Sequence, residues 1–275
     1  MDPLATMGSR LFVTAVFSQH SKRQKMPQKS NTIKEMLLQF PKQRISLSPE
    51  MNAIHLNTLQ ENRERQTILS RVSSLLEGWM HRQVARGGSG LKGAILEIGA
   101  GTLNHVSLEP PGVEYDAIEP FQLLYENKAE LTAIRKIHGD ISDLDIGPAY
   151  DRVISVATLE HLTDLPRVVA QSGLLLKEGG IFQAGIPSEG GFLWGMSWRL
   201  TTAIAFKLKT GLDFSKHMEY EHINDASEIR QVLKYFFHDV SVHRFPFPLF
   251  HLSLYEYVEC KNPRGEICRQ YLSSN

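Results

Sequence analysis

The chain has 275 residues, of which 42% are hydrophobic and 22% charged, and 30 Lys and Arg side chains balance 30 Asp and Glu side chains. This composition excludes a disordered or fibrous protein, and the neutral net charge excludes the broad positive field of a general nucleic-acid binder. The length is sufficient for one domain with additions, so we predict a single-domain enzyme.

The beginning of the chain is basic. Residues 1–50 carry eight basic and three acidic side chains, which predicts a basic, mobile N-terminal extension over 1–48. The apolar run 11–17 is too short to span a bilayer and lacks a small-residue cleavage site, so we expect neither membrane insertion nor secretion. Met7 and Met26 leave the start of translation open.

Leucines, isoleucines and methionines at helical spacing follow the extension and stop at the glycine-rich stretch 87–90. Ser48 suits a helix N-cap, and Pro49 suits the first helical position. We therefore predict one or two helices over 49–88, before the core.

From residue 89 onward, short apolar runs alternate with helical stretches, which is typical of a parallel α/β sheet. Strands are predicted at 93–98, 113–118, 135–138, 150–157 and 180–186. Helices are predicted at 121–130, 164–175 and 226–237. Asp225 and Glu228 have the spacing of a capping box at the start of the last helix.

Two final strands, 239–245 and 252–260, flank a Pro-Phe-Pro turn and predict an antiparallel hairpin at one sheet edge. Residues 263–275 are interpreted as a C-terminal tail. Cys260 and Cys268 have no partner at zinc-finger spacing, so we interpret them as free thiols in a reducing compartment. This favours a cytoplasmic location.

The most informative segment is the glycine turn that follows the first core strand. Gly99 and Gly101 can adopt positive φ and let a ligand approach the backbone. The next apolar strand ends at Glu119, at about the separation at which a ribose-binding carboxylate follows such a turn in dinucleotide folds. The same glycines also suit an ordinary strand-to-helix turn, but the acidic residues at later strand ends favour cofactor binding.

Five segments follow one another in a fixed order: Glu97-Ile98-Gly99-Ala100-Gly101-Thr102, Glu119-Pro120, His138-Gly139-Asp140-Ile141, Tyr150 to Leu162, and Leu174 to Gly180. In this order they resemble the motifs of class I S-adenosylmethionine-dependent methyltransferases. The resemblance implies a Rossmann-like α/β fold over residues 89–262, with a mostly parallel seven-stranded sheet and S-adenosylmethionine as the cofactor. It also implies that the glycine turn lies beneath the methionine part, that Glu119 holds the ribose and that Asp140 accepts from the adenine amino group.

By this resemblance, the cofactor-binding residues are Glu97, Gly99, Ala100, Gly101, Thr102, Glu119, Pro120, Asp140, Ile141, Ala157 and Thr158. Two departures stand out: Leu103 occupies a position where the family often has a third glycine, and Pro110-Pro111 leaves room for only a short helix. A nicotinamide dinucleotide fits less well, because its Gly-x-Gly-x-x-Gly turn would need glycine at Asn104.

His161 is the candidate general base, because it follows the fourth strand at the ligand-binding edge and imidazole titrates near neutral pH. A histidine that only shapes the floor of the site explains the pattern equally well. Glu160-His161 also resembles ubiquinone-type and small-RNA methyltransferases, in which a glutamate three residues ahead completes a metal site. Ala157 occupies that place here, so we expect no bound metal.

The segment 188–224 is a long insertion before the last helix, and in the resembled superfamily this region shapes the acceptor pocket. The candidate acceptor-binding residues are Glu189, Trp194, Glu221 and His222. A helical flap that buries its tryptophans and solvates its charges is the alternative. A membrane-surface role for 194–209 is conceivable and less favoured.

These observations predict methyl transfer to a small molecule, at oxygen rather than at nitrogen or carbon, with a hydroxylated sugar or sugar-derived metabolite as acceptor. The preference for oxygen rests on His161 and on the absence of an Asn/Asp-Pro-Pro-Tyr element after the fourth strand. The alternatives are a non-catalytic cofactor-binding or interaction protein and a nicotinamide-dependent oxidoreductase. The sequence specifies neither the acceptor nor the oligomeric state.

Overall fold

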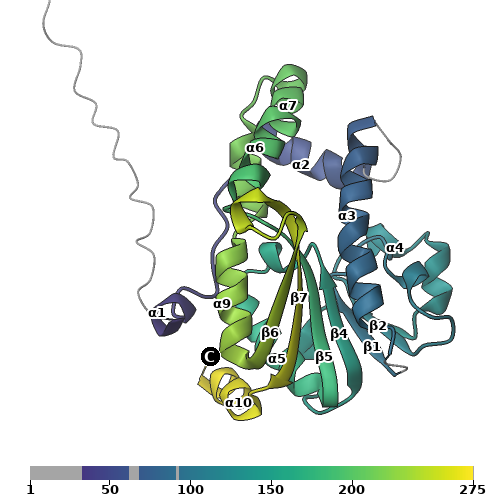
Figure 1. Ribbon diagram of the computed structural model, residues 1–275. Coiled ribbons are helices and arrows are strands. Elements are labelled where there is room, and N and C mark those ends of the chain that lie inside the picture. Colours follow the sequence, from purple (N-terminus) through teal and green to yellow (C-terminus); the bar gives the residue numbers. More distant parts are fainter. Residues whose placement is uncertain (1–32, 62–67, 91–92, 275) are drawn as a thin grey trace, which may run out of the picture.

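A seven-stranded sheet forms the centre of the computed structural model, which describes residues 33–61, 68–90 and 93–274 (Figure 1). The strands are β1 (Ile95–Ile98), β2 (Tyr115–Ile118), β3 (Lys136–His138), β4 (Tyr150–Val156), β5 (Leu176–Pro187), β6 (Phe237–Pro246) and β7 (Ser253–Pro263). Their spatial order is β3-β2-β1-β4-β5-β7-β6. The first five run parallel, and β7 pairs antiparallel with both β5 and β6. The predicted Rossmann-like sheet with an antiparallel edge hairpin is confirmed.

Strand β1 lies at the centre of the parallel part, and all four of its residues are buried. A parallel strand covered on both faces needs apolar residues in a continuous run, which explains the lack of alternation in its sequence. Ile98, its last residue, pairs in register with Ile118 of β2 and Ser155 of β4. The segments that follow these three strands therefore begin side by side at one edge of the sheet.

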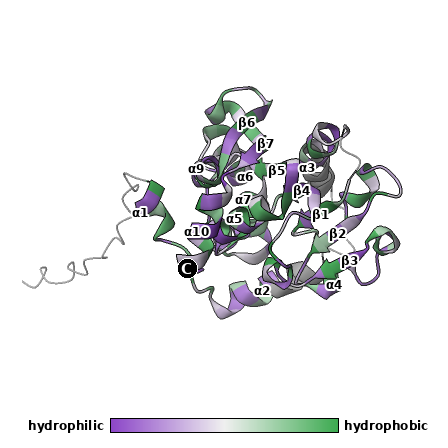
Figure 2. Cartoon of the chain, turned by 90° about the horizontal axis from the view of Figure 1, so that it is seen from below, coloured by the Kyte–Doolittle hydropathy of each residue, from purple (hydrophilic) through white to green (hydrophobic). Residues whose placement is uncertain are grey.

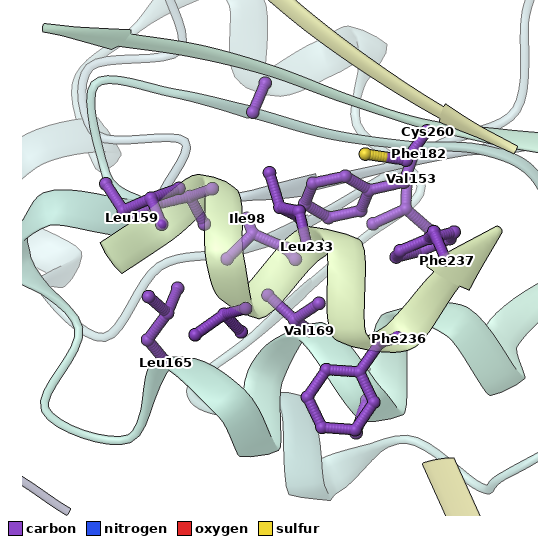
Figure 3. Packing of buried hydrophobic residues seen from close by; sticks show 14 of the residues in the cluster. Ile98, Val153, Leu159, Leu165, Val169, Phe182, Leu233, Phe236, Phe237 and Cys260 are labelled. Carbon is purple, nitrogen blue, oxygen red and sulfur yellow. The ribbon is translucent and has the colours of Figure 1, made fainter. Parts of the chain in front are cut away.

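One face of the sheet is covered by α5 (Leu165–Leu175) and α9 (Ala226–Phe236). Figure 3 shows Val169 of α5 and Leu233 of α9 packed beneath Phe182 and Val153 of the sheet, and all four side chains are fully buried. Burying such side chains contributes about 1.5–3 kcal/mol each. This core holds the strands that carry the candidate site.

Both of these helices begin where the sequence predicts. Asp164 accepts a hydrogen bond from the Arg167 N–H at the start of α5. Asp225 and Glu228 form a reciprocal capping box at the start of α9, as their spacing predicts. Each cap satisfies backbone donors that the first helical turn cannot pair internally.

The segment expected as a C-terminal tail, 263–275, is helical from Gly265 to Ser274 (α10) and packs against α5. Cys268 of this helix is buried in the same core as Cys260 of β7. Both are free cysteines, as predicted. The hydrophobic contact of α10 explains why a short C-terminal segment is ordered.

The opposite face is covered by α3 (Ile68–Gly87) and the short 3-10 helix η1 (Val106–Leu108). A buried polar network crosses this face. Arg152, which is 1% exposed, donates to Glu109 at 2.6 Å and to the Val84 carbonyl at 3.0 Å. His105 Nε2 bonds the other Glu109 oxygen at 2.8 Å. The buried charges are therefore compensated, as charges in a protein interior must be.

The predicted helix 121–130 is wrong in its extent. The chain forms α4 (Gln122–Tyr125), a single turn, and then the 3-10 helix η2 (Ala129–Ala133). Lys128 between them is extended, with φ −93° and ψ 135°, which interrupts the helical ladder. No residue of α4 is buried, so packing does not stabilise a longer helix there.

Part of the segment expected as a mobile extension, 1–48, is built into the fold. Helix α1 (Ile33–Leu37) shows hydrophobic and hydrophilic residues in Figure 2 and packs against α9, and Met36, Leu37 and the following Phe40 are buried in the hydrophobic cluster that includes residues of α5 and α9. Helix α2 (Pro49–Glu61) then begins at the predicted cap, where Ser48 Oγ accepts from the Met51 N–H at 3.2 Å. Residues 1–32, which include the apolar run 11–17, Met7 and Met26, lie outside the described residues.

The insertion 188–224 is helical. It contains α6 (Phe192–Leu200), α7 (Thr202–Thr210) and α8 (Phe214–Glu221). Figure 1 places α6 and α7 at the same end of the sheet as α2. Three further 3-10 turns are η3 (Ile141–Asp143), η4 (Leu159–His161) and η5 (Phe250–Leu252). Among the helices of the described residues, none combines the length and apolar character needed to cross a membrane.

Candidate functional site

The two glycines of the turn after β1 serve different physical purposes. Both have positive φ, +70° at Gly99 and +51° at Gly101. A side chain at Gly99 would collide with Thr158, whose Cγ2 would lie 2.3 Å from the added Cβ. Beside Gly101 nothing lies within 4 Å of that position. Gly99 is therefore required by packing, whereas Gly101 leaves bare backbone open to a ligand.

Glu119, immediately after β2, is tied directly to this turn. One carboxylate oxygen accepts from the Gly101 N–H at 2.8 Å, and the other accepts from the Phe121 N–H at 2.9 Å. Burial raises the pKa of Glu119, although the two backbone N–H bonds oppose the shift. Each oxygen keeps a further lone pair, so the carboxylate can still accept from two hydroxyls.

Glu97 lies two residues before the turn and is 2% exposed. Burial raises its pKa from the usual 4.5 to about 8, although the Tyr115 hydroxyl, which donates to it at 2.7 Å, opposes this rise. Glu97 is therefore largely neutral at pH 7, unlike an ordinary glutamate.

Three further cofactor candidates differ in their burial and hydrogen bonds. Asp140 is exposed and caps η3, with its carboxylate accepting from the backbone N–H and the hydroxyl of Ser142. Ile141 is buried in the core, whereas Pro120 is exposed. The cap fixes the position of Asp140, and its second oxygen is not used by Ser142.

Thr158 supports the glycine turn from the neighbouring strand end. Its hydroxyl lies 3.3 Å from the Gly99 carbonyl and 3.1 Å from the Val156 carbonyl, both of which are acceptors. Ala157 before it has φ +51° and is exposed, a conformation that is costly for a residue with a Cβ. Thr158 therefore packs against the glycine turn, and the small, exposed Ala157 leaves the end of β4 uncovered.

His161 lies at the end of η4 with one ring nitrogen fixed. Its Nδ1–H donates to the Glu221 carbonyl at 2.8 Å, which leaves Nε2 of the neutral ring as the basic nitrogen. Nε2 lies 3.9 Å from a carboxylate oxygen of Glu160. Glu160 is 2% exposed, and burial raises its pKa. Its Oε2 has no hydrogen-bond partner among the described residues, so a buried acceptor is available next to His161.

The predicted acceptor residues meet at this point. The ring of His222 packs edge-on against His161, with centroids 4.9 Å apart, and its Nδ1 bonds Glu189 at 2.5 Å. Burial lowers the pKa of His222, but the Glu189 carboxylate outweighs burial and leaves the pKa raised. The ring of Trp194 stacks on that of His222, with centroids 6.3 Å apart, and its indole nitrogen is buried without a partner among the described residues. We call His161, Glu189, Trp194, Glu221 and His222 the acceptor cluster.

Sequence reasoning missed the segment that crosses over this cluster. Arg44 donates to the backbone carbonyls of His161 at 2.6 Å and Glu221 at 3.1 Å. Lys42 donates to the Ile223 carbonyl at 2.8 Å and pairs with Glu228. No sequence signal marked these two residues, because each acts through backbone carbonyls far away in the chain.

A continuous series of contacts joins the two halves of the site. Glu119 bonds Gly101, Thr158 bonds Gly99, and the His161 N–H donates to the Thr158 carbonyl at 2.9 Å. The glycine turn and the acceptor cluster therefore lie along one edge of the sheet. This is the edge at which open α/β sheets bind their ligands.

Comparisons with known proteins agree with this architecture. No protein-family model matches the chain, and no curated protein matches it in sequence. Among solved structures, a SAM-dependent methyltransferase from Thermotoga maritima, described as a possible histamine N-methyltransferase, is similar with a TM-score of 0.51 and 17% identity, over 74% of this chain and 97% of that chain.

Two further solved structures have lower similarity. A possible exported protein from Bordetella parapertussis has a TM-score of 0.49 and 16% identity, over 83% of this chain and 79% of that one. An O-methyltransferase family protein from Burkholderia thailandensis has a TM-score of 0.48 and 14% identity, over 68% and 56% of the two chains. With the strand order described above, the first of the three similarities establishes that the chain has the fold of S-adenosylmethionine-dependent methyltransferases.

Proposed function

We propose that the protein is a methyltransferase that takes its methyl group from S-adenosylmethionine and transfers it to a small-molecule acceptor. The observation that carries the proposal is the joining of the open Gly101 turn and the acceptor cluster along one sheet edge. A methyl donor and an acceptor must lie close together for an in-line displacement. The cofactor, when bound, supplies the electrophilic methyl group.

The residues at the turn fit this cofactor. Open space beside Gly101 admits the methionine part, and both oxygens of Glu119 have capacity for the ribose hydroxyls. The second oxygen of Asp140 would accept from the adenine amino group.

Transfer to a hydroxyl fits the acceptor cluster best. Removal of the hydroxyl proton requires a base, and the hydrogen bond from Nδ1 of His161 to Glu221 leaves Nε2 able to take that proton. The neighbouring Glu160 carboxyl would stabilise the imidazolium that forms. Glu189 and His222 offer polar contacts to further hydroxyls, which favours a hydroxylated sugar or a related metabolite.

A nicotinamide-dependent oxidoreductase is the less favoured alternative. Dinucleotide sites place the pyrophosphate at the N-terminus of a helix that follows the glycine turn. Here the turn leads into the three-residue η1, and Asn104 stands at the third glycine position. A non-catalytic binding protein would retain the turn but would not need the fixed tautomer of His161.

Titration calorimetry with S-adenosylmethionine, S-adenosylhomocysteine and NAD tests the cofactor assignment. We expect both sulfur compounds to bind and NAD not to bind. Glu119→Ala should weaken cofactor binding by about 1–3 kcal/mol, as expected for loss of hydrogen bonds to a charged group. Glu178→Ala, an exposed glutamate on β5, is the matched control and should bind normally. NAD binding without binding of either sulfur compound would refute the assignment.

A radiolabelled methyl-transfer assay against panels of alcohols, sugars, phenols and amines tests the acceptor class. His161→Ala should lower turnover at least tenfold while cofactor affinity changes less than twofold. His238→Ala, an exposed histidine on β6, should leave both quantities unchanged. Equal turnover in the His161 variant would remove this residue from the reaction, and transfer only to amines would refute the preference for hydroxyls.

A further inference from the structure

Three potential metal ligands from two helices meet next to the acceptor cluster. His217 and Glu221 lie four residues apart on α8, so they share one face of the helix. His55 of α2 reaches the same place from the N-terminal part of the chain. One nitrogen of each histidine and one oxygen of Glu221 all lie within 4.8 Å of one another.

The contacts within this trio leave one ring nitrogen without a partner. His55 Nδ1 lies 2.9 Å from Glu221 Oε1, and the rings of His55 and His217 have centroids 5.5 Å apart. Nδ1 of His217 is buried and has no hydrogen-bond partner among the described residues. A buried ring nitrogen without a partner destabilises the folded state unless a ligand satisfies it. A metal ion would engage this nitrogen together with the other two side chains.

The surroundings suit a metal ion with nitrogen ligands. The ring of Phe214 lies 5.4 Å from that of His217, and the ring of Phe206 lies 6.4 Å away. These rings lower the local polarity, which strengthens the attraction between a cation and its ligands. Two imidazoles and one carboxylate match the donor set of zinc sites that keep an open fourth position, whereas Mg²⁺ prefers oxygen ligands alone.

The separations are close to those of a coordinated ion. A tetrahedral zinc ion holds its ligand atoms roughly 3.3 Å apart, given bonds of about 2.0–2.1 Å. In the structure one ligand atom of each residue lies within 4.8 Å of the other two, and His55 Nδ1 lies 2.9 Å from Glu221 Oε1. The widest separation would have to close by at most roughly 1.5 Å for the three atoms to reach coordination distance around one ion.

We propose that His55, His217 and Glu221 form a binding site for a divalent transition-metal ion of the Zn²⁺ class. The site differs from the Glu160-His161 pair, for which we expected no metal, because it shares neither residue. It joins α2 to α8 and leaves one coordination position for water or an acceptor oxygen.

The position of the site gives the ion a second consequence. Glu221 also provides the backbone carbonyl that fixes the His161 tautomer, and its Oε2 lies 3.6 Å from His161 Nδ1. A metal on Glu221 would draw this carboxylate toward His55 and His217. The ion would therefore hold the end of α8 in place beside His161 and act as a positioning element.

Metal binding can be measured directly on the full chain without an affinity tag, after treatment with a chelator. Titration with Co²⁺ should give visible absorption bands that saturate at one equivalent, and Zn²⁺ should displace the Co²⁺. Zn²⁺ should also raise the thermal unfolding midpoint, because a ligand that binds only the folded state stabilises it. These experiments measure metal binding and thermal stability alone, so their outcome does not depend on whether the protein transfers methyl groups.

Substitutions test whether the ion binds at His55, His217 and Glu221 or at the neighbouring Glu160-His161 pair. His55→Ala and His217→Ala should each weaken Zn²⁺ binding at least tenfold and remove the rise in unfolding midpoint. His55→Gln is a milder second variant, and far-ultraviolet circular dichroism verifies that each variant is folded. His238→Ala, on the exposed part of β6, is the control and should bind Zn²⁺ as the unmodified protein does.

Three results would each overturn the proposal. The first is that the unmodified protein binds no Zn²⁺ at one equivalent. The second is that folded His55 and His217 variants retain its full affinity. The third is that His161→Ala abolishes binding while both of those variants retain it, which would place the ion at the Glu160-His161 pair instead.

Discussion

Substitution of Glu97 by Gln should stabilise the protein, and more so as the pH rises. Glu97 is buried beside the Tyr115 hydroxyl, and burial raises its pKa to about 8. The glutamine side chain has the shape of the protonated carboxyl and keeps an oxygen that can accept from Tyr115. The substitution therefore removes the titration of Glu97 while it preserves the packing.

The magnitude follows from the difference between the folded and unfolded pKa of Glu97. Between the unfolded value of 4.5 and the folded value of about 8, the folded state keeps a proton that the unfolded state has lost. The free energy of unfolding of the unmodified protein therefore falls as the pH rises through this window. At 1.36 kcal/mol per pH unit, the Gln variant should gain roughly 3 kcal/mol between pH 4.5 and pH 7 relative to the unmodified protein.

Urea unfolding at half-unit steps from pH 4.5 to pH 8.5 measures this difference. Comparison of the two proteins cancels the titration of every other group. Glu178→Gln makes the same chemical change at an exposed position and should give a curve parallel to that of the unmodified protein. If the Glu97→Gln curve is also parallel, the carboxyl is ionised in the folded state and the reasoning from burial fails.

Three further outcomes are expected from groups on the α3 face of the sheet. Arg152→Ala should lower the free energy of unfolding by about 3–5 kcal/mol, because it leaves the buried Glu109 charge with too few partners. Urea unfolding measures this loss, and a loss below about 1 kcal/mol would contradict the prediction. Leu103→Gly should destabilise the protein by about 2 kcal/mol, because the cavity left by this fully buried side chain outweighs the roughly 1–2 kcal/mol gained by relieving φ +61°. A higher unfolding midpoint of the variant in calorimetry would show instead that the backbone strain outweighs the cavity. Burial, and then the facing His105, lower the pKa of His81 to about 4, so as the pH falls the unfolded state is protonated at His81 before the folded state. The free energy of unfolding should therefore fall by about 2 kcal/mol from pH 6.5 to pH 4. His81→Gln should flatten this fall in urea unfolding, and an unchanged slope would show that His81 does not cause it.

The positions of most strands along the chain were predictable because local patterns specify them. Buried parallel strands such as β1 and β4 appear as short, mostly apolar segments that contain a few polar residues, and the capping box at Asp225 and Glu228 depends on residues three apart. The helix at 121–130 failed for the opposite reason. No residue of α4 is fully buried, only Tyr125 packs against the core, and propensity alone does not hold a helix of that length.

The residues of the candidate site that were predictable lie after β4 or in the insertion after β5. His161, Glu189, Trp194, Glu221 and His222 were each expected, and the structure brings them together. Arg44 and His55 were not expected as site residues. Their contacts span more than a hundred residues of sequence, and neither a motif nor a hydrophobic period records such a contact.

The salt bridge and carbonyl contacts of Lys42 and Arg44 have a consequence for exchanging parts between proteins of this fold. A chimera that transplants residues 89–262 onto another protein of this fold would carry the glycine turn, Glu119 and the insertion helices. It would leave behind the two cations that fasten α8 and the loop before α9 to the sheet edge. The unit that a protein engineer can move with this sheet edge intact therefore begins before Lys42.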